Sequence, residues 1–326
     1  MALIINGNTI PTNVASALIY DGVSLTNLIY NGINVWSQFL GNSIGLFYGG
    51  FSHFGATTNT VTRIDSTGAL VGSETAVGVV TQTKGPAGAS VGSNGLFYGG
   101  TNGSTAVNRV TRIDSNGSMV GSVTYAGTSR SFSAGATVGS NGLFYGGSNS
   151  TSVAQKIATL INSLGTLVQA ETSLGTARED LAGATVGSNG LFYGGDIGGN
   201  NNNKVTRIDS NGSLVGSETA VGTARYGLAG ASVGSNGLFY AGYASNNSNK
   251  VTRIDSNGAI VGSETTVATL RYVLAGATVG SNGLFYGGFN NTNYYNNVDR
   301  IDNNGVIVGS ETAIGTARYY LGGAGL

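Results

Sequence analysis

Short apolar runs separated by polar, glycine-rich stretches alternate along the chain, and one pattern of this kind returns six times. The hexapeptide GLFYGG occurs five times and GLFYAG once, at intervals of 46 to 50 residues. The copies open at Gly45, Gly95, Gly142, Gly190, Gly237 and Gly283. A unit of roughly 50 residues cannot bury its apolar surface without neighbours, so the pattern predicts a stacked or circular array of repeats.

The copy that begins at Ala229 predicts four short strands. We expect them at 231–233, 238–240, 251–254 and 259–261, with tight turns at Gly-Ser-Asn-Gly and Asp-Ser-Asn-Gly. The second run, Leu-Phe-Tyr, is apolar on both faces, which predicts a sheet that is covered on both sides. No apolar period of 3.6 residues accompanies these runs, and this argues against a helical solenoid.

Four antiparallel strands covered on both faces are typical of a propeller blade, so we predict an all-β fold with a six-bladed β-propeller over residues 41–326. An open β-solenoid is the alternative, and it needs end caps. The chain ends favour a ring, because Leu321–Leu326 match the beginning of a copy and the missing continuation starts at Gly41. We therefore expect N- and C-terminal strands to share blade 1.

The stretch TARYGLAGASVGSNGLFYAG from Thr223, followed by NKVTRIDSNGSLVG, resembles a Kelch repeat. The shared features are an arginine before the first strand, an apolar second strand that ends in a glycine pair, and an Asn-x-Val-x-x-apolar-Asp segment. The third strand has Ile where the family has Tyr, and the fourth lacks the family's Trp. The resemblance implies a Kelch-like propeller, and no family partner or activity is carried over.

Residues 1–40 predict a separate β-hairpin module. Three apolar segments alternate with Asn-Gly or Asp-Gly, which are strong hairpin signals. The segment LIYNGINVW resembles short modules of tailed-bacteriophage virion proteins. About 40 residues seldom support an independent core, so we expect the module to anchor the chain on other virion proteins or on its own copies, with Tyr30, Val35 and Trp36 as anchoring candidates. Packing of the hairpins against the propeller is the alternative.

Composition narrows the function classes. Fifteen basic and fifteen acidic residues cancel, which argues against nucleic acid or an anionic membrane as the main partner. There is no cysteine, so disulfides and thiolate metal sites are excluded. The N-terminus lacks a signal-peptide pattern, and no apolar stretch is long enough to insert into a membrane. We expect a chain made in the host cytoplasm and located in the virion.

Two sets of charged residues recur. Arg-Ile-Asp stands on the third strand of five copies, and we expect its charges to satisfy each other or a neighbouring blade. The second set consists of arginines before the first strand, Arg130, Arg178, Arg225, Arg271 and Arg318, and of upstream glutamates, Glu74, Glu171, Glu218, Glu264 and Glu311. Bridging between blades is the expected role of this set. An arginine ring that lines the channel and binds an anion is the alternative.

Catalytic machinery is not visible in the sequence. The single histidine, His53, has no neighbouring carboxylate, and the repeated Asp-Ser-Asn-Gly turn lacks the ligand spacing of a calcium loop. Glu179 and Asp180 form the one unrepeated acidic pair, which we interpret as solvated loop charge. We therefore expect no enzyme activity, no cofactor and no metal.

The copies differ most after the glycine pair, in the loops between the second and third strands, and recognition usually resides in variable loops on a rigid scaffold. These loops are rich in Asn, Ser, Gly and Tyr, which suits contacts with a protein or sugar. The candidate binding residues are His53, Phe54, Asp196, Tyr243, Phe289, Asn293, Tyr294 and Tyr295. Drift in unconstrained loops is the alternative.

The predicted function is that of a non-enzymatic phage virion structural protein, present in multiple copies. A tail- or fibre-associated adhesin would bind a host surface protein or glycan through the variable loops. A purely architectural capsid-decoration or tail-collar protein is one alternative. A glycan-processing propeller is another, and its signature would be unrepeated carboxylates that converge on the channel, for which the candidates are Glu179, Asp180, Asp196 and Asp299.

Overall fold

A computed structural model describes residues 44–52, 57–77 and 84–326, together with the backbone of six short strands in the first 43 residues. Every described element is a β-strand. Within this described part, no helix has the length and apolar character needed to cross a membrane. The chain divides into two units, Met1–Gly41 and Asn42–Leu326.

The first unit contains three antiparallel hairpins. Their strands are β1 (Leu3–Ile5) with β2 (Asn8–Ile10), β3 (Leu18–Tyr20) with β4 (Val23–Leu25), and β5 (Asn27–Tyr30) with β6 (Ile33–Ser37). Each hairpin encloses one of the Asn-Gly or Asp-Gly pairs in the sequence. Strands β5 and β6 change register between Leu28 and Ile29.

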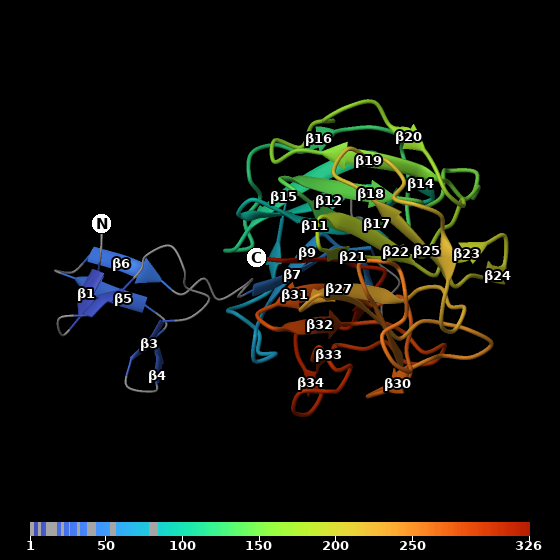
Figure 1. Cartoon of the computed structure of the whole chain (residues 1–326). Coiled ribbons are helices and arrows are strands. Elements are labelled where there is room, and N and C mark those ends of the chain that lie inside the picture. Colours follow the sequence, from blue (N-terminus) through green and yellow to red (C-terminus); the bar gives the residue numbers. More distant parts are fainter. Residues whose placement is uncertain are drawn as a thin grey trace. The chain divides into compact units, whose positions relative to one another are not determined.

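The second unit is a six-bladed β-propeller, in which six four-stranded antiparallel sheets are arranged in a ring (Figure 1). The strands of each blade, from the axis outward, are as follows: blade 1, β36 (Gly322–Gly325), β7 (Ile44–Tyr48), β9 (Thr60–Asp65) and β10 (Thr75–Ala76); blade 2, β11 (Ala87–Val91), β12 (Asn94–Tyr98), β15 (Arg109–Asp114) and β16 (Thr124–Tyr125); blade 3, β17 (Ala134–Val138), β18 (Asn141–Tyr145), β19 (Ile157–Ile161) and β20 (Thr172–Ser173); blade 4, β21 (Ala182–Val186), β22 (Asn189–Tyr193), β25 (Lys204–Ile208) and β26 (Thr219–Ala220); blade 5, β27 (Ala229–Val233), β28 (Asn236–Tyr240), β29 (Lys250–Ile254) and β30 (Thr265–Thr266); blade 6, β31 (Ala275–Val279), β32 (Asn282–Tyr286), β33 (Asn297–Ile301) and β34 (Thr312–Ala313). The described part of the propeller also contains short two-stranded sheets. They are β8 (Phe51–Ser52) with β35 (Arg318–Tyr319), β13 (Thr101–Asn102) with β14 (Thr105–Ala106), and β23 (Asp196–Ile197) with β24 (Asn200–Asn201).

The first three strands of each repeat lie where the sequence predicts them, but the prediction for the fourth is wrong. In blade 5 the segment 259–261 makes only an isolated bridge between Ile260 and Ile254, and the outer strand is β30. The Asp255 carboxylate accepts hydrogen bonds from the amides of Asn257 and Ala259, and this keeps the segment in a tight turn. The chain forms the outer strand only after Gly262, whose φ of +67° bends it away.

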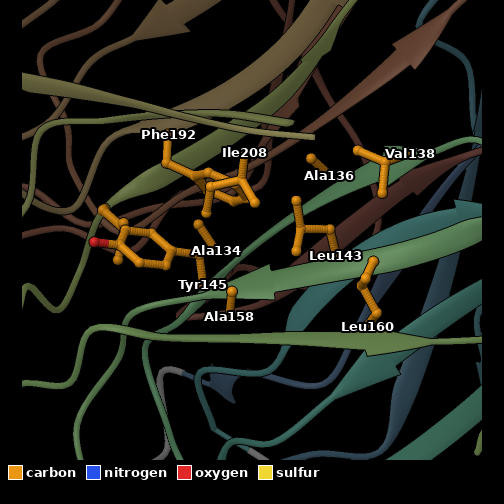
Figure 2. Packing of buried hydrophobic residues seen from close by; sticks show 10 residues of the cluster. Ala134, Ala136, Val138, Leu143, Tyr145, Ala158, Leu160, Phe192 and Ile208 are labelled. Atoms are coloured by element: carbon orange, nitrogen blue, oxygen red, sulfur yellow. The ribbon is translucent and has the colours of Figure 1, made fainter. Parts of the chain in front are cut away.

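Neighbouring blades interlock through the aromatic residues of the GLFY strand. In Figure 2, Phe192 and Ile208 of blade 4 pack with Ala134, Tyr145 and their neighbours in blade 3. The rings of Tyr145 and Phe192 are 5.2 Å apart at their centroids. Equivalent Tyr–Phe pairs occupy all six interfaces between blades, at 5.0 to 5.3 Å. Because Tyr faces one neighbour and Phe the other, the second strand is apolar on both faces.

The inner strands approach so closely that only glycine fits at their centre. A Cβ on Gly230 would lie 2.3 Å from the carbonyl oxygen of Gly183 in the previous blade. The same close approach, at 2.2 to 2.4 Å, recurs at every blade. The six residues that form this ring are Gly88, Gly135, Gly183, Gly230, Gly276 and Gly323. The glycine at the second position of each inner strand therefore sets how tightly the ring closes.

The two ends of the chain close the propeller, as the sequence predicts. Strand β36 pairs antiparallel with β7, with Gly322 opposite Tyr48 and Gly325 opposite Gly45. In Figure 1 the C-terminus lies beside β7. The amide and carbonyl of Leu326 also bond those of Ile44, at 2.7 and 2.9 Å. The all-β class, the six blades and the shared first blade are thus confirmed, and the open solenoid is excluded.

Deletion of residues 321–326 is expected to lower the melting temperature by roughly 10 °C or more, because it removes the inner strand of blade 1 and exposes β7 and its apolar face. Scanning calorimetry measures the change. Deletion of residues 1–41, which form the other unit, is the control and should shift the transition far less. Equal melting temperatures for the shortened and full chains would show that closure does not stabilise the ring.

The substitution Gly230→Ala is expected to destabilise the chain by about 3 kcal/mol or more, because the new methyl group collides with a backbone oxygen that the neighbouring blade holds in place. Denaturant unfolding measures the loss. The control is Gly187→Ala, where a Cβ meets open space and only the positive φ is unfavourable, at a cost of about 1 kcal/mol. The glycine ring has no special role if both variants lose the same stability.

Candidate functional site

The axial channel is narrow and lined by small residues. It has a volume of about 490 Å³, and its walls are the Ala-Gly-Ala-Ser/Thr segments of five inner strands and Gly322–Gly325 of the sixth. The hydroxyls in these segments are engaged, since the amide of Thr137 bonds the hydroxyl of Thr185 and that of Thr185 bonds Ser232. No charged side chain that the structure describes lines this channel.

The recurring arginines are buried between blades and do not face the channel, so the structure rules out the anion-binding ring considered above. All five are 0% exposed. In blade 5, the guanidinium of Arg225 donates to the carbonyls of Ala241 and Lys250 at 2.6 and 2.8 Å, and to the hydroxyl of Thr252. Arg318 makes the same contacts with Gly49 and Thr60 across the closure of the ring.

Each buried arginine lies close to a glutamate of its own blade. Glu264 is 3.6 Å from Arg225, and its carboxylate also accepts hydrogen bonds from Thr223 and Thr252. Burial alone would raise the pKa of Glu264, but these hydrogen bonds outweigh it and lower the pKa to about 2. In blade 2 both charges are replaced in the sequence, by Thr83 and Val123. The arginine–glutamate set is therefore structural, and its charges occur together or not at all.

Blade 6 departs from this arrangement, because Asp299 replaces the threonine that accepts from the arginine. Arg271 pairs with Asp299, and it lies 3.8 Å from Glu311. Burial, with the neighbouring Glu311 carboxylate, raises the pKa of Asp299 to about 7 against the attraction of Arg271. Two carboxylates thus share one arginine, and Arg271 and Asp299 are fully buried whereas Glu311 is partly exposed. This unrepeated carboxylate lies between blades and not in the channel.

The Arg-Ile-Asp motif does not form ion pairs among the described residues, so the expectation of mutual charge satisfaction is wrong. The aspartates cap their own turns, as Asp209 does by accepting from the amides of Asn211 and Ser213. The arginines extend to the next blade, where Arg207 donates to the carbonyl of Ser256 at 3.4 Å. Asn162 replaces aspartate in blade 3 because an amide oxygen caps the turn equally well.

One end of the channel carries a closed ring of backbone hydrogen bonds, which we call the mouth ring. Its members directly precede the inner strands: Gly85, Phe132, Asp180, Gly227, Val273 and Tyr320. Each amide donates to the carbonyl of the previous member, and Gly85 donates to Tyr320, at 2.6 to 3.1 Å. All six have a positive φ of 52° to 68°, including four residues with side chains. Such strain persists only where the surroundings determine it fully.

Six residue pairs surround the mouth ring, one on each blade. In each pair, the residue after the buried arginine position bridges the residue after the glycine pair. These pairs are Tyr319 with Phe51, Lys84 with Thr101, Ser131 with Ser148, Glu179 with Asp196, Tyr226 with Tyr243, and Tyr272 with Phe289. The variable loops and the connections between blades thus share one face. We call it the mouth face.

Aromatic side chains occupy one half of the mouth face, over blades 5, 6 and 1. We call this half the aromatic sector, and its members are Phe51, Tyr226, Tyr243, Tyr272, Phe289, Tyr294 and Tyr319. Successive rings contact each other at centroid distances of 4.9 to 6.1 Å, and all are half-buried. Tyr320 and Phe132 of the mouth ring extend this contact, at 5.3 and 4.9 Å.

The opposite half is polar, and it places acidic groups beside the aromatic sector. The backbones of Glu179 and Asp196 form a β-bridge in blade 4. Asp180 lines a smaller cavity of about 70 Å³ at the mouth ring. Burial, followed by the nearby carboxylates of Glu179 and Asp196, raises the pKa of Asp180 to about 8, while Lys84 opposes the shift. Our interpretation of Glu179 and Asp180 as solvated loop charge is therefore wrong for Asp180.

The structure places the predicted binding residues unequally. Tyr243, Phe289 and Tyr294 belong to the aromatic sector, and Asn293 is exposed in the turn before Tyr294. Asp196 caps its own hairpin by accepting from the amide of Gly199.

Tyr295 turns away from the sector. Its hydroxyl accepts from Asn290, and its ring lies over the buried Arg271. His53 and Phe54 lie outside the described residues. The anchoring candidates Tyr30, Val35 and Trp36 lie in β5 and β6, whose backbone alone is described.

Sequence reasoning missed half of the mouth face. Tyr226, Tyr272 and Tyr319 follow the buried arginines, and Asp180 and Tyr320 stand one position later. These two columns vary between copies as much as the loops do, and that variation was the available signal. The residue types in the first column do not reveal the β-bridges that join Tyr226 to Tyr243 and Tyr272 to Phe289.

No protein-family model matches the chain, and no curated protein matches it in sequence. Within the described residues, no group of three or more His, Asp or Glu side chains is arranged to hold a metal ion.

The substitution Asp299→Thr, which restores the residue found in blades 1, 3, 4 and 5, is expected to stabilise the chain by about 1–3 kcal/mol at pH 8. Asp299 has a folded-state pKa of about 7 against an ordinary 3.8, so the folded chain holds the proton more tightly. The stability that the raised pKa of Asp299 contributes is therefore fully present below pH 3.8 and is lost as the pH rises through 7. The gain should shrink at pH 4.5.

Denaturant unfolding of both proteins at the two pH values measures this difference. The reverse change in blade 5, Thr252→Asp, is the matched control and should reproduce the loss of stability at pH 8. A pH-independent gain would contradict the raised pKa of Asp299.

Proposed function

We propose that this chain is a non-enzymatic bacteriophage virion protein, a tail- or fibre-associated adhesin, in which a Kelch-like propeller binds a host surface through its mouth face. The observation that carries the proposal is the aromatic sector. Seven half-buried aromatic rings in mutual contact are confined to three of six otherwise equivalent blades.

Repetition of the blade supplies an internal comparison. The turns between the first two strands lie on the opposite side of each blade. They contain Gly-Ser and are nearly identical in the five complete copies. The fold thus tolerates Ser131 with Ser148 in blade 3 at the positions where blade 6 has Tyr272 with Phe289. The aromatic residues are not needed to build a blade, and this supports a role in binding.

The chemistry of the sector suits a recognition surface. Tyrosine and phenylalanine offer large contact areas at a low cost in side-chain entropy, and the hydroxyls of tyrosine bind polar groups. Asparagine-rich loops border the sector, and the amide of Asn247 already joins two of them by donating to the carbonyl of Asn290. The virion part of the proposal rests on the resemblance of the segment LIYNGINVW, residues 28–36, to short modules of phage virion proteins. We propose that residues 1–40 contact other virion proteins.

The substitution Tyr294→Ala in the full chain is expected to weaken adhesion by about tenfold or more, because the ring of Tyr294 extends the sector to its exposed loop. Binding of the labelled chain to a panel of bacterial cells and their isolated envelope glycans measures the effect. Tyr125→Ala is the control, since Tyr125 is 69% exposed on the outer strand of blade 2. Equal adhesion by both variants would refute binding through the sector, and absence of the chain from purified particles would refute the virion assignment.

A further inference from the structure

The mouth ring surrounds a cavity that holds a carboxylate without a bonded partner. Asp180 is fixed by its backbone, whose amide and carbonyl both belong to the ring. Among the described residues, no group donates a hydrogen bond to its carboxylate, and none forms an ion pair with it within 4 Å. Burial disfavours the charged form of such an acid unless a cation approaches it.

Aromatic side chains surround the same carboxylate. Phe132 and Tyr320 line the cavity with Asp180. Tyr226 and Tyr272 lie close enough for the charge of Asp180 to add to the effect of burial on their pKa values, which reach about 12 for Tyr226. The faces of aromatic rings attract cations, and a carboxylate supplies the counter-charge.

The chain already shows one ammonium group in these surroundings. The Nζ of Lys84 lies 4.6 Å from the ring centroid of Tyr320, and 5.7 and 5.6 Å from those of Phe132 and Phe51. Burial lowers the pKa of Lys84, and the charge of Asp180 opposes this change. When Asp180 is ionised, one ammonium stands against three carboxylates, those of Glu179, Asp180 and Asp196, so the mouth then carries an excess of negative charge.

We propose that the cavity at the mouth ring binds the ammonium head group of a choline-like ligand, with Asp180 as counter-ion and Phe132 and Tyr320 as aromatic walls. This inference rests on the proposed recognition function and names its ligand chemistry. The cavity, at about 70 Å³, has room for a small head group and not for a larger ligand. The rest of the ligand would lie across the aromatic sector.

Titration calorimetry of the full chain with choline tests the proposal, and 3,3-dimethylbutanol serves as the neutral ligand of equal shape. Choline should bind at least about tenfold more tightly than the alcohol. Asp180→Asn should remove most of this preference. Asp209→Asn is the matched control, since Asn162 fills the same turn position in blade 3 and the fold accepts it. Equal binding of choline and the alcohol, or binding of neither, would overturn the proposal.

The pH dependence supplies a second readout. Asp180 must lose its proton to pair with a cation, and its pKa is about 8, so choline should bind more weakly at pH 6 than at pH 9 and should release protons on binding near neutral pH. Glu179, Asp196, Lys84, Tyr226, Tyr272 and Tyr320 are the other titratable groups that act on or respond to Asp180. Choline affinity that is flat between these pH values would count against Asp180 as the counter-ion.

The substitution Lys84→Met tests whether the ammonium group of Lys84 competes with the ligand for the cavity. If Lys84 competes for the cavity, the variant should bind choline more tightly, and a loss of binding would show that the site needs Lys84 and overturn the assignment. Adhesion is measured separately. Adhesion that depends on Tyr294 without choline binding would sink this inference alone, whereas choline binding without adhesion would sink the proposed function alone.

Discussion

The close approach of the six inner strands around the axis is the constraint on which the rest of the structure depends. Adjacent backbones lie so near that the ring admits no side chain at Gly230 and its equivalents. This approach holds together only as a closed circle, and the pairing of β36 with β7 completes it. Closure removes two open sheet edges and places Arg318 against Gly49 and Thr60, residues more than 250 positions away.

Between the blades, stability combines apolar interlocking with buried charge. Six Tyr–Phe pairs fill the interfaces, and the buried guanidinium groups donate hydrogen bonds to backbone carbonyls. The buried arginine and its glutamate occur together in five blades and are both absent from the remaining one. Blade 2 lacks both members, whereas blade 6 adds Asp299 and with it a second carboxylate for one arginine. Burial explains this behaviour, because an unpaired charge there is costly.

The residues that we propose for binding lie where the sixfold repetition is broken. The uniform positions build the blades, and the two variable columns beside the arginines and the glycine pairs meet on one face. Aromatic residues gather over blades 5, 6 and 1, and acids over blade 4, so a scaffold with nearly equal blades presents an asymmetric surface. A rigid ring with individual loops is suited to binding, since changes at its face do not disturb its interior.

The sequence by itself determined the repeat, the strand positions other than the fourth, the six-bladed ring and its closure, because these follow from local patterns that recur six times. It also indicated that Tyr243, Phe289 and Tyr294 share a variable face. Only the tertiary structure decided that the arginines are buried away from the channel, that Tyr295 turns inward, and that Asp180 joins a hydrogen-bonded ring beside tyrosines from other blades. The reason is physical: these outcomes depend on contacts between repeats far apart in the chain, and no local pattern encodes which side chains meet across the axis.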